Sequence, residues 1–533
     1  MFICKSKNRV MRTKLLFALL VFNIPMLAVN ALFAQGQPQF VKQVAQVTSV
    51  VEMNGNFYFV SGSELWKSDG TTNGTVPIKQ FQNVGFAQQM KLIVGGSHLY
   101  FFANDGTNGF ELWKSDGTTN GTVLIKDINP NGDSFQGAYQ VLIWAINTLF
   151  FTADNGTNGV ELWKSDGTEV GTSMIKDINP GAEGSTPQFA IYHNGELFFD
   201  ASNGVVSREL FKSDGTEAGT VLVKDIGESA ITGVNPSFPG SFFVSNNELY
   251  FIARPFGGSF YLHKTDGTTL GTNPVNSMIF SQSYAPIVQY NGNMFFPGQT
   301  TFNNLELAKS DGTSVGTVLL NEINTNGASN PEWFCVANNL LFFQANDGTN
   351  GVELWKTDGT TNSLVKDIYA GSTNSSNPNF LVSFNNSLFF AANDGINGNE
   401  LWKSDGSTNG TVMFADINPG TASSSPYNLF VFNDELYFAA SDGNQSGLWK
   451  LGTSSAGFTE NTTNMLFVHP NPAANIVNVK TSLPTKATIS ATDGVILANL
   501  ELNGETSIDV STYAPGVYFI RTAEGQTVKF IKE

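Results

Sequence analysis

The chain has 533 residues, a formal net charge of -17, 53 glycines and 44 phenylalanines, and only 14% of its residues are charged. A chain of this length can bury a large core, and abundant glycine together with aromatic residues is typical of short strands joined by turns, so we expect an all-β globular protein. Its negative charge repels nucleic acid and anionic lipid, which excludes both as expected partners.

The first 34 residues have the pattern of a secretory signal peptide. Basic residues extend to Lys14, an apolar run follows, and cleavage is expected after Ala34. A membrane anchor is the alternative, but Asn23 and Pro25 interrupt a run that is already short for a bilayer span of about 20 residues. Removal of residues 1–34 takes away five positive charges and leaves a formal charge of -22. No segment of the mature chain is expected to span a membrane.

A repeat dominates the middle of the chain. It is clearest at residues 111–118 and 161–168, which both read Glu-Leu-Trp-Lys-Ser-Asp-Gly-Thr. Its Trp position recurs at intervals of 45 to 52 residues, close to the length of a propeller blade and far from that of ankyrin or tetratricopeptide repeats. The residues at this position are Trp66, Trp113, Trp163, Phe211, His263, Ala308, Trp355, Trp402 and Trp449. We expect the six tryptophans to be packing anchors between blades.

Each period has room for four short strands. In one period we expect strands at residues 139–146, 148–153, 160–165 and 172–178, each rich in β-branched or aromatic residues and bounded by Gly, Asn, Asp or Pro. Four antiparallel strands per period are typical of a propeller blade. The sequence therefore predicts a β-propeller of eight or nine four-stranded blades over residues 35–451.

The two ends of the repeat region complement each other. The last period stops after its third strand, at Lys450, whereas Phe40–Val44 has the pattern of a fourth strand. Pairing of these segments would complete the final blade and leave no exposed sheet edge, which predicts nine blades. Propellers usually have about four to eight blades. Eight blades with one decayed or external unit is therefore an alternative, and an open solenoid is a third.

The repeat also resembles a known family. The pattern Glu-Leu-Trp-x-x-Asp-Gly-Thr-x-x-Gly-Thr is similar to the ELWxxDGT repeat of exported bacterial surface proteins, over residues 40–451. The match is strongest at the repeats that begin with Glu111, Glu161, Glu353 and Glu400. The resemblance implies the propeller fold and an extracellular setting, and it implies no particular chemistry.

The composition changes after the repeats. Residues 452–464 are rich in Gly, Ser and Thr, as in a flexible linker, and residues 465–533 have a separate pattern of strands and turns. Motifs at residues 467–473, 491–494 and 515–520 closely resemble, in order and spacing, the type A sorting domain of the type IX secretion system. This resemblance implies a small C-terminal β-sandwich that the secretion machinery recognises, and release or surface attachment of the passenger. An immunoglobulin-like accessory module is the alternative.

Oxygen-rich loops between the second and third strands are candidate calcium sites, because Ca²⁺ is bound by carboxylate and amide oxygens. The candidate ligands are Asp105, Asp154, Asp347 and Asp394. No EF-hand spacing occurs, and Asn-Gly and Asp-Gly are ordinary turn formers, so plain turns are the alternative. The repeated aspartates of the Asp-Gly-Thr segments, such as Asp116, are expected to accept hydrogen bonds within turns rather than to act in catalysis.

The same loops depart from the repeat in the fourth to sixth periods. Arg208, Arg254, Phe256 and Phe302 appear there. Arginine and exposed aromatic residues suit an anionic or sugar-containing ligand, and loop faces are where propellers usually bind ligands. The sequence therefore predicts ligand binding at these four residues, with neutral drift as the alternative.

Signals for catalysis are few. The chain has no His-Glu-x-x-His zinc motif and no phosphate-binding loop. Glu183, Glu228 and Glu332 are acids outside the repeat that could pair for glycoside hydrolysis. We therefore expect a secreted or surface-attached adhesion or ligand-binding module for glycans or other surface macromolecules, exported by the Sec and then the type IX machinery. An extracellular glycan-acting enzyme and a structural surface protein without a ligand are the alternatives.

Overall fold

The computed structural model describes residues 36–82, 90–135, 141–228, 235–255, 258–371, 374–451, 466–469, 473–481, 484–491, 495–523 and 527–533. All the regular secondary structure in these ranges consists of β-strands. The chain divides into two compact units, a repeat array that ends near residue 451 and a C-terminal unit. The signal peptide expected at residues 1–34 and the linker expected at 452–464 lie outside the described residues. Within the described ranges, no helix has the length and hydropathy needed to cross a bilayer.

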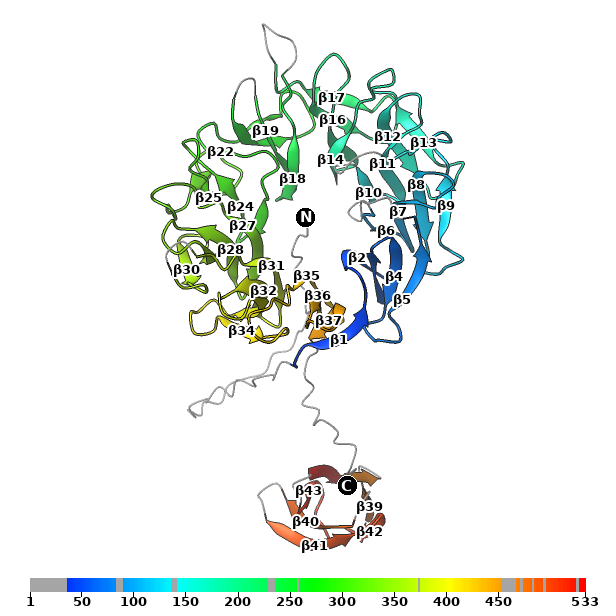
Figure 1. Cartoon of the computed structure of the whole chain (residues 1–533), viewed down its shortest axis with the longest axis vertical. Coiled ribbons are helices and arrows are strands. Elements are labelled where there is room, and N and C mark those ends of the chain that lie inside the picture. Colours follow the sequence, from blue (N-terminus) through cyan, green and yellow to red (C-terminus); the bar gives the residue numbers. More distant parts are fainter. Residues whose placement is uncertain are drawn as a thin grey trace, which may run out of the picture. The chain divides into compact units, whose positions relative to one another are not determined.

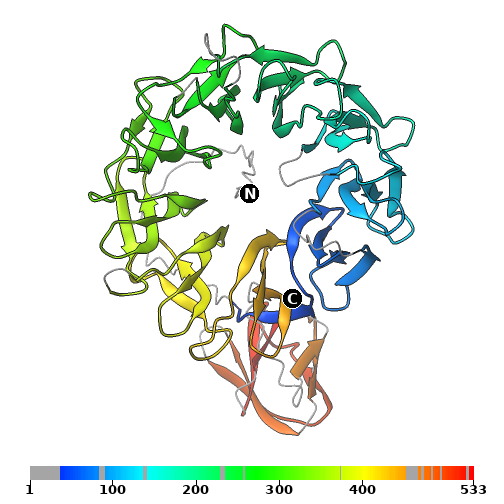
Figure 2. The same ribbon diagram turned by 45° about the horizontal axis from the view of Figure 1, so that its top comes forward.

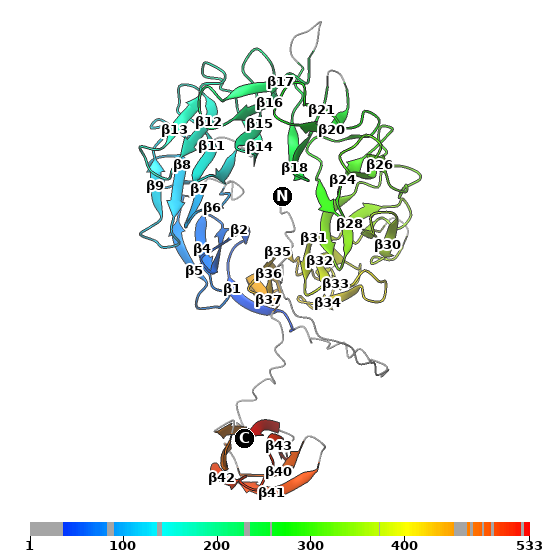
Figure 3. The same ribbon diagram turned by 180° about the vertical axis from the view of Figure 1, so that it is seen from behind.

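The array contains, over its described residues, eight antiparallel sheets of four strands and one of five. A representative sheet has the order β10 (Leu142–Ala145), β11 (Thr148–Asp154), β12 (Val160–Ser165) and β13 (Ser173–Lys176), close to the four strands expected from the sequence. Figure 1 shows the sheets following one another around a common centre, with the first strand of each sheet innermost and the fourth outermost. Figures 2 and 3 show the same arrangement tilted and from behind.

Strands in equivalent positions recur along the chain. The first strands are β2 (Thr48–Met53), β6 (Ile93–Gly95), β10, β14 (Gln188–His193), β18 (Gly240–Ser245), β23 (Val288–Tyr290), β27 (Glu332–Ala337), β31 (Asn379–Phe384) and β35 (Tyr427–Phe432). The third strands, which contain the Glu-Leu-Trp position, are β4 (Glu64–Ser68), β8 (Phe110–Ser115), β12, β16 (Glu209–Ser213), β20 (Phe260–Thr265), β25 (Glu306–Ser310), β29 (Val352–Thr357), β33 (Asn399–Ser404) and β37 (Ser446–Leu451).

The N-terminal strand belongs to the last sheet of the array. β1 (Gln39–Gln43) pairs antiparallel with β37, with Phe40 opposite Trp449, and completes the order β1-β37-β36-β35, where β36 is Glu435–Ser441. This confirms the pairing expected from the missing fourth strand of the final repeat. β1 comes from the opposite end of the array and covers the edge of β37, which would otherwise be unpaired.

The first and last sheets also share a hydrophobic core. Phe57 of β3 (Asn56–Ser61) lies 5.0 Å from Phe432 of β35, centroid to centroid, with the rings edge to face. Both side chains are almost completely buried. The sheets at the two ends of the array therefore pack on each other by the same kind of contact that joins its other sheets.

Each repeat tryptophan packs between neighbouring sheets. Trp113 of β8 is 4% exposed and lies in a cluster with Tyr58 and Leu65 of the preceding sheet. The other five anchors are buried to a similar degree: Trp66, Trp163, Trp355, Trp402 and Trp449. One repeat cannot bury its apolar face alone, so this packing explains why the repeats form a continuous array.

The C-terminal unit is built differently. Its sheets have the orders β38-β39-β42 and β41-β40-β43-β44, from β38 (Leu466–His469) to β44 (Thr527–Lys532). Val479 of the first sheet shares one hydrophobic core with Ile489 and Phe530 of the second. The unit therefore has a core of its own, separate from that of the repeat array.

Candidate functional site

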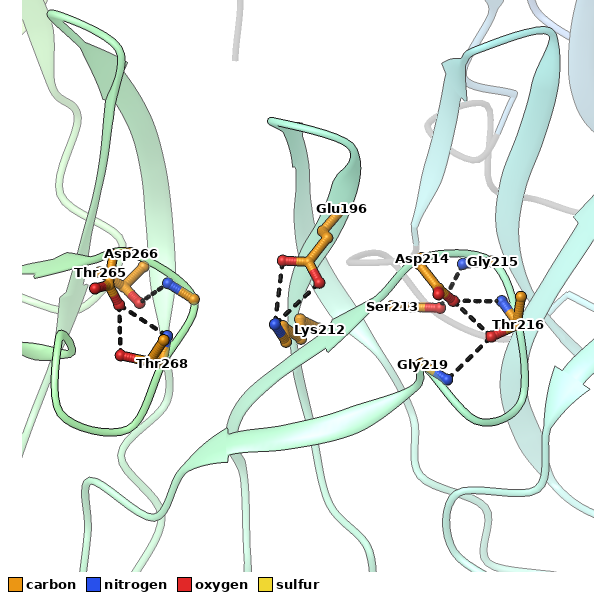
Figure 4. A network of polar contacts seen from close by, with 11 residues as sticks. Glu196, Lys212, Ser213, Asp214, Gly215, Thr216, Gly219, Thr265, Asp266 and Thr268 are labelled. Carbon is orange, nitrogen blue, oxygen red and sulfur yellow. Dashed lines mark hydrogen bonds and ion pairs between the residues drawn. The ribbon is translucent and has the colours of Figure 1, made fainter.

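The repeated aspartates lie in turns between the third and fourth strands. Asp214 Oδ1 accepts hydrogen bonds from the N–H of Thr216 at 2.8 Å and from its hydroxyl at 2.7 Å, and Thr216 Oγ1 accepts from the N–H of Gly219 at 3.0 Å (Figure 4). Any Cβ at Gly219 would overlap the Asp214 carboxylate, which explains the second glycine of the repeat. These hydrogen bonds lower the pKa of Asp214. The same turn occurs at Asp69, Asp116, Asp166, Asp266 and Asp311.

The lysine of the repeat joins these turns to neighbouring sheets. Lys164 Nζ donates to the carbonyl of Gly215 in the next sheet at 2.8 Å. Lys212 instead forms an ion pair with Glu196 of its own sheet at 2.9 Å (Figure 4). The intersheet bond is repeated by Lys114 to Gly167, Lys309 to Gly359 and Lys356 to Gly406. The Asp-Gly-Thr segments therefore serve the packing of the array.

The glutamate that opens the repeat holds the connection to the next sheet. Glu209 is completely buried, and its carboxylate accepts hydrogen bonds from the N–H of Ile226 at 2.8 Å, of Gly227 at 3.2 Å and of Ser237 at 3.1 Å. Burial raises the pKa of Glu209 to about 7, although the hydrogen bonds lower it. Equivalent buried carboxylates are Glu111, Glu161, Glu306, Glu353 and Glu400. The sequence alone did not predict this role; the available signal was the serine that recurs in each following connection.

The four candidate calcium ligands cap their own loops. Asp105 Oδ1 accepts from the N–H groups of Thr107 and Asn108, both at 2.9 Å, and Asp105 Oδ2 accepts from the side-chain amide of Asn108 at 2.8 Å. Related bonds are made by Asp154, Asp347 and Asp394. The described part of the chain contains no group of three or more His, Cys, Asp or Glu side chains placed to hold a metal ion. Calcium binding at these loops stays a prediction.

Arg208, the first predicted ligand-binding residue, is engaged inside the protein. Its guanidinium forms an ion pair with the buried Asp200 at 2.8 Å and donates to the hydroxyl of Thr186 at 2.9 Å and to its carbonyl at 3.2 Å. Burial raises the pKa of Asp200 to about 7, while the adjacent Arg208 lowers it. All three nitrogen atoms of the Arg208 guanidinium therefore donate to Asp200 or Thr186.

Arg254 and Phe302 lie in loops of two successive sheets, after β19 (Glu248–Ala253) and after β24 (Asn293–Gly298). The Arg254 guanidinium lies 5.1 Å from the ring centroid of Phe238, a cation–π contact. Phe302 is 76% exposed, and its ring packs against Phe280 at 5.0 Å. Phe256 lies outside the described residues. Of the predicted set, Phe302 is the described side chain that presents a large apolar surface to solvent.

A different set of aromatic rings gathers where the innermost strands begin, and the sequence alone did not predict it. Trp333 of β27 lies 4.9 Å from Phe380 of β31, and Phe380 lies 6.2 Å from Tyr427 of β35, so three consecutive sheets each contribute one ring. Phe189 of β14 stacks on Tyr284 at 4.2 Å. We refer to these five side chains as the inner aromatic rings. Trp333 is 40% exposed and Tyr284 is 36% exposed, so both present ring surface to solvent.

Tyr284 reaches across an intervening sheet to meet Phe189. The sheet between them begins with Gly240 of β18, where a Cβ would lie 2.5 Å from the Tyr284 ring. Only glycine leaves room for the tyrosine at this point. The pair therefore depends on three sheets that are consecutive in the array.

Four of the five inner aromatic residues have backbone in the strained left-handed region, and one of them is Tyr284 with a φ of 58°. Phe189, Trp333 and Phe380 have φ values of 48°, 56° and 53°, each at a register shift between the first and second strands. Bulky side chains are rarely found in this left-handed region, and residues held there cost of order 1 kcal/mol or more. The equivalent bulge holds smaller residues in three other first strands: Ser49, Ser241 and Asn428. The bulge itself therefore does not require an aromatic residue.

Amide side chains accompany the rings. Gln188, Asn379 and Asn428 occupy the first two positions of β14, β31 and β35, and Asn379 Oδ1 is buried without a hydrogen-bond partner. Glu332, the acid that precedes Trp333, accepts a hydrogen bond from the Gln344 amide at 3.2 Å. The arrangement offers aromatic faces and amide groups, which suit binding by ring contact and hydrogen bonding.

Comparison with solved structures gives low similarities. The chain resembles PorZ, a surface component of the type IX secretion system of Porphyromonas gingivalis, at 12% identity over 91% of this chain and 75% of that one, with a TM-score of 0.33. It resembles the extracellular domain of the hybrid two-component system BT4673 from B. thetaiotaomicron at 12% identity, 91% and 74% coverage and a TM-score of 0.32. A puromycin-hydrolyzing peptidase of Mycobacterium tuberculosis matches at 9% identity and a TM-score of 0.34, over 66% of this chain and 59% of that one. These values assign neither fold nor activity.

The C-terminal unit gives the one specific family match. No curated protein matches the sequence. Residues 467–533 match the secretion system C-terminal sorting domain, which agrees with the motifs noted at residues 467–473 and 515–520. The chain thus ends in a type IX secretion sorting domain, which supports secretion and attachment at the outer cell surface.

Proposed function

We propose that this chain is an exported surface protein whose repeat array is a closed nine-bladed β-propeller that binds extracellular glycans or other macromolecules without catalysis. In this proposal residues 1–34 are a signal peptide, 35–451 the propeller with ELWxxDGT repeats, 452–464 a linker, and 465–533 a β-sandwich sorting domain. The pairing of β1 with β37 and the contact between the first and last sheets support closure.

The observation that supports a binding function is that the repeat acids are engaged in hydrogen bonds within the protein, whereas two aromatic rings are partly exposed to solvent. The repeated aspartates and buried glutamates are engaged in turns and sheet connections, so they are not available as reacting groups. Trp333 and Tyr284 instead present ring surface to solvent. Partly exposed rings grouped on several sheets are typical of a binding surface rather than of a packed core.

The purified full-length chain should be applied to a glycan array and to immobilised surface macromolecules, in the presence of calcium and of a chelator. We expect selective binding with no change in the chain length of the bound polysaccharide. Cleavage of a polysaccharide would favour the enzyme instead. Neither binding nor cleavage would favour a structural surface protein. Loss of binding in the chelator would assign a role to Asp105, Asp154, Asp347 and Asp394.

A further inference from the structure

We propose that the inner aromatic rings form the ligand site of the array and that the ligand is an uncharged glycan. This inference rests on the binding function proposed above and specifies its location and its ligand class. In the site, the faces of Trp333, Phe380 and Tyr427 contact sugar rings, and neighbouring amides bind sugar hydroxyls. The axial C–H groups of a sugar ring carry partial positive charge and pack on the negative face of an aromatic ring.

The charges around the rings argue for an uncharged ligand. The first two positions of β14, β27, β31 and β35 contain no basic residue and one acid, Glu332. The chain as a whole has a formal charge of -17, so an anionic glycan would be repelled and would find no cation at these positions. Gln188 and Asn379 supply neutral amide groups, and Asn379 Oδ1 is a buried acceptor without a partner, whereas Asn428 Nδ2 already donates to the carbonyl of Val47.

The backbone conformation of these residues indicates a role for the rings beyond packing. The same bulge is built with Ser49, Ser241 and Asn428 in other first strands, so an aromatic side chain is not needed to form it. Trp333 and Phe380 nevertheless occupy the left-handed region, where a bulky residue is disfavoured relative to Asn. An aromatic residue that has an exposed ring in this disfavoured backbone conformation, as Trp333 does, is best explained by a ligand contact.

The test compares Trp333→Asn and Phe380→Asn with the wild-type full-length chain. Because Asn tolerates positive φ, both variants should unfold at the same temperature as the wild type or at a higher one. Each should bind uncharged glycans at least about 10-fold more weakly, which corresponds to about 1.4 kcal/mol and to the loss of a ring contact. Ile146→Asn is the matched control, since Ile146 is an exposed apolar residue at positive φ outside the set, and the affinity of this variant should equal that of the wild type.

Four results would overturn the inference. Undiminished binding by Trp333→Asn and Phe380→Asn would place the site elsewhere while leaving the binding function intact. Preference for anionic over uncharged oligosaccharides in competition would refute the ligand class. Destabilisation of both variants would show that the rings are packing residues; in that case Trp333→Phe, which keeps a ring at the same backbone position, should restore stability. A wild-type chain that binds no glycan would refute this inference together with glycan binding as its function.

Discussion

Replacement of Glu161 by alanine tests whether the buried glutamate of the repeat holds successive sheets together. The Glu161 carboxylate is completely buried and accepts hydrogen bonds from the N–H of Ile178 at 3.1 Å, of Asn179 at 3.1 Å and of Ser185 at 2.8 Å. Alanine would remove the partner of these three N–H donors and of the Ser185 hydroxyl, which donates to the same carboxylate at 2.5 Å, and each donor left unsatisfied costs about 1–3 kcal/mol. Removal of a buried carboxylate offsets part of this cost. We expect the free energy of unfolding to fall by about 3–6 kcal/mol.

Denaturant unfolding followed by tryptophan fluorescence measures this change in the array alone, because all eight tryptophans lie between Trp66 and Trp449 and the sorting domain has none. Glu161→Gln keeps the side-chain size and one acceptor oxygen, so it should cost only about 1–2 kcal/mol. The exposed Glu169 is in the adjacent turn, and Glu169→Ala should change stability by less than about 0.5 kcal/mol. Equal stabilities of Glu161→Ala and Glu169→Ala would refute the reasoning.

Three further predictions follow from the packing of the array. Burial raises the pKa of Glu111 and Glu209 from 4.5 to about 7. Between these pH values the native state keeps protons that the unfolded chain releases, so the free energy of unfolding should fall as pH rises from about 4.5 to 7. Glu209→Gln should flatten this part of the curve of unfolding free energy against pH. An unchanged slope in Glu209→Gln would contradict this assignment. Gly171→Ala should lower the free energy of unfolding by about 1–3 kcal/mol, because the new Cβ would displace the Asp166 carboxylate, and a double-mutant cycle with Asp166→Ala should show a smaller loss. Deletion of residues 36–43 removes β1 and exposes the edge of β37, which should lower the thermal midpoint and increase light scattering; an unchanged midpoint would show that β1 is not needed for closure.

Much of the fold could be predicted because its signals are local. The recurrence of Trp113, Trp163 and their equivalents gave the repeat period and a prediction of eight or nine blades, and each period contained recognisable strands and turns. The pairing of β1 with β37 could be predicted because the last period lacks a fourth strand while residues 40–44 have the pattern of one. The sorting domain could be identified because its motifs occur in a fixed order within 67 residues.

The candidate site could not be predicted in the same way, because its residues are distant in the chain. The ion pair of Arg208 with the buried Asp200 is an example, because the pairing of β15 (Glu196–Ala201) with β16 brings the two residues together. Phe189 and Tyr284 meet across an intervening sheet, and nothing in either local sequence indicates the other.

The sequence by itself determined the all-β class, the repeat period and the secretion tail, since these depend on spacing, turn residues and motif order that act over a few tens of residues. The tertiary structure decided that the repeat glutamates are buried hydrogen-bond acceptors and that Trp333, Phe380 and Tyr427 form one aromatic surface. The physical reason is that both features bring together groups that are distant in the chain. Which of these groups meet is set by how the sheets pack on one another and not by the neighbouring residues in the sequence.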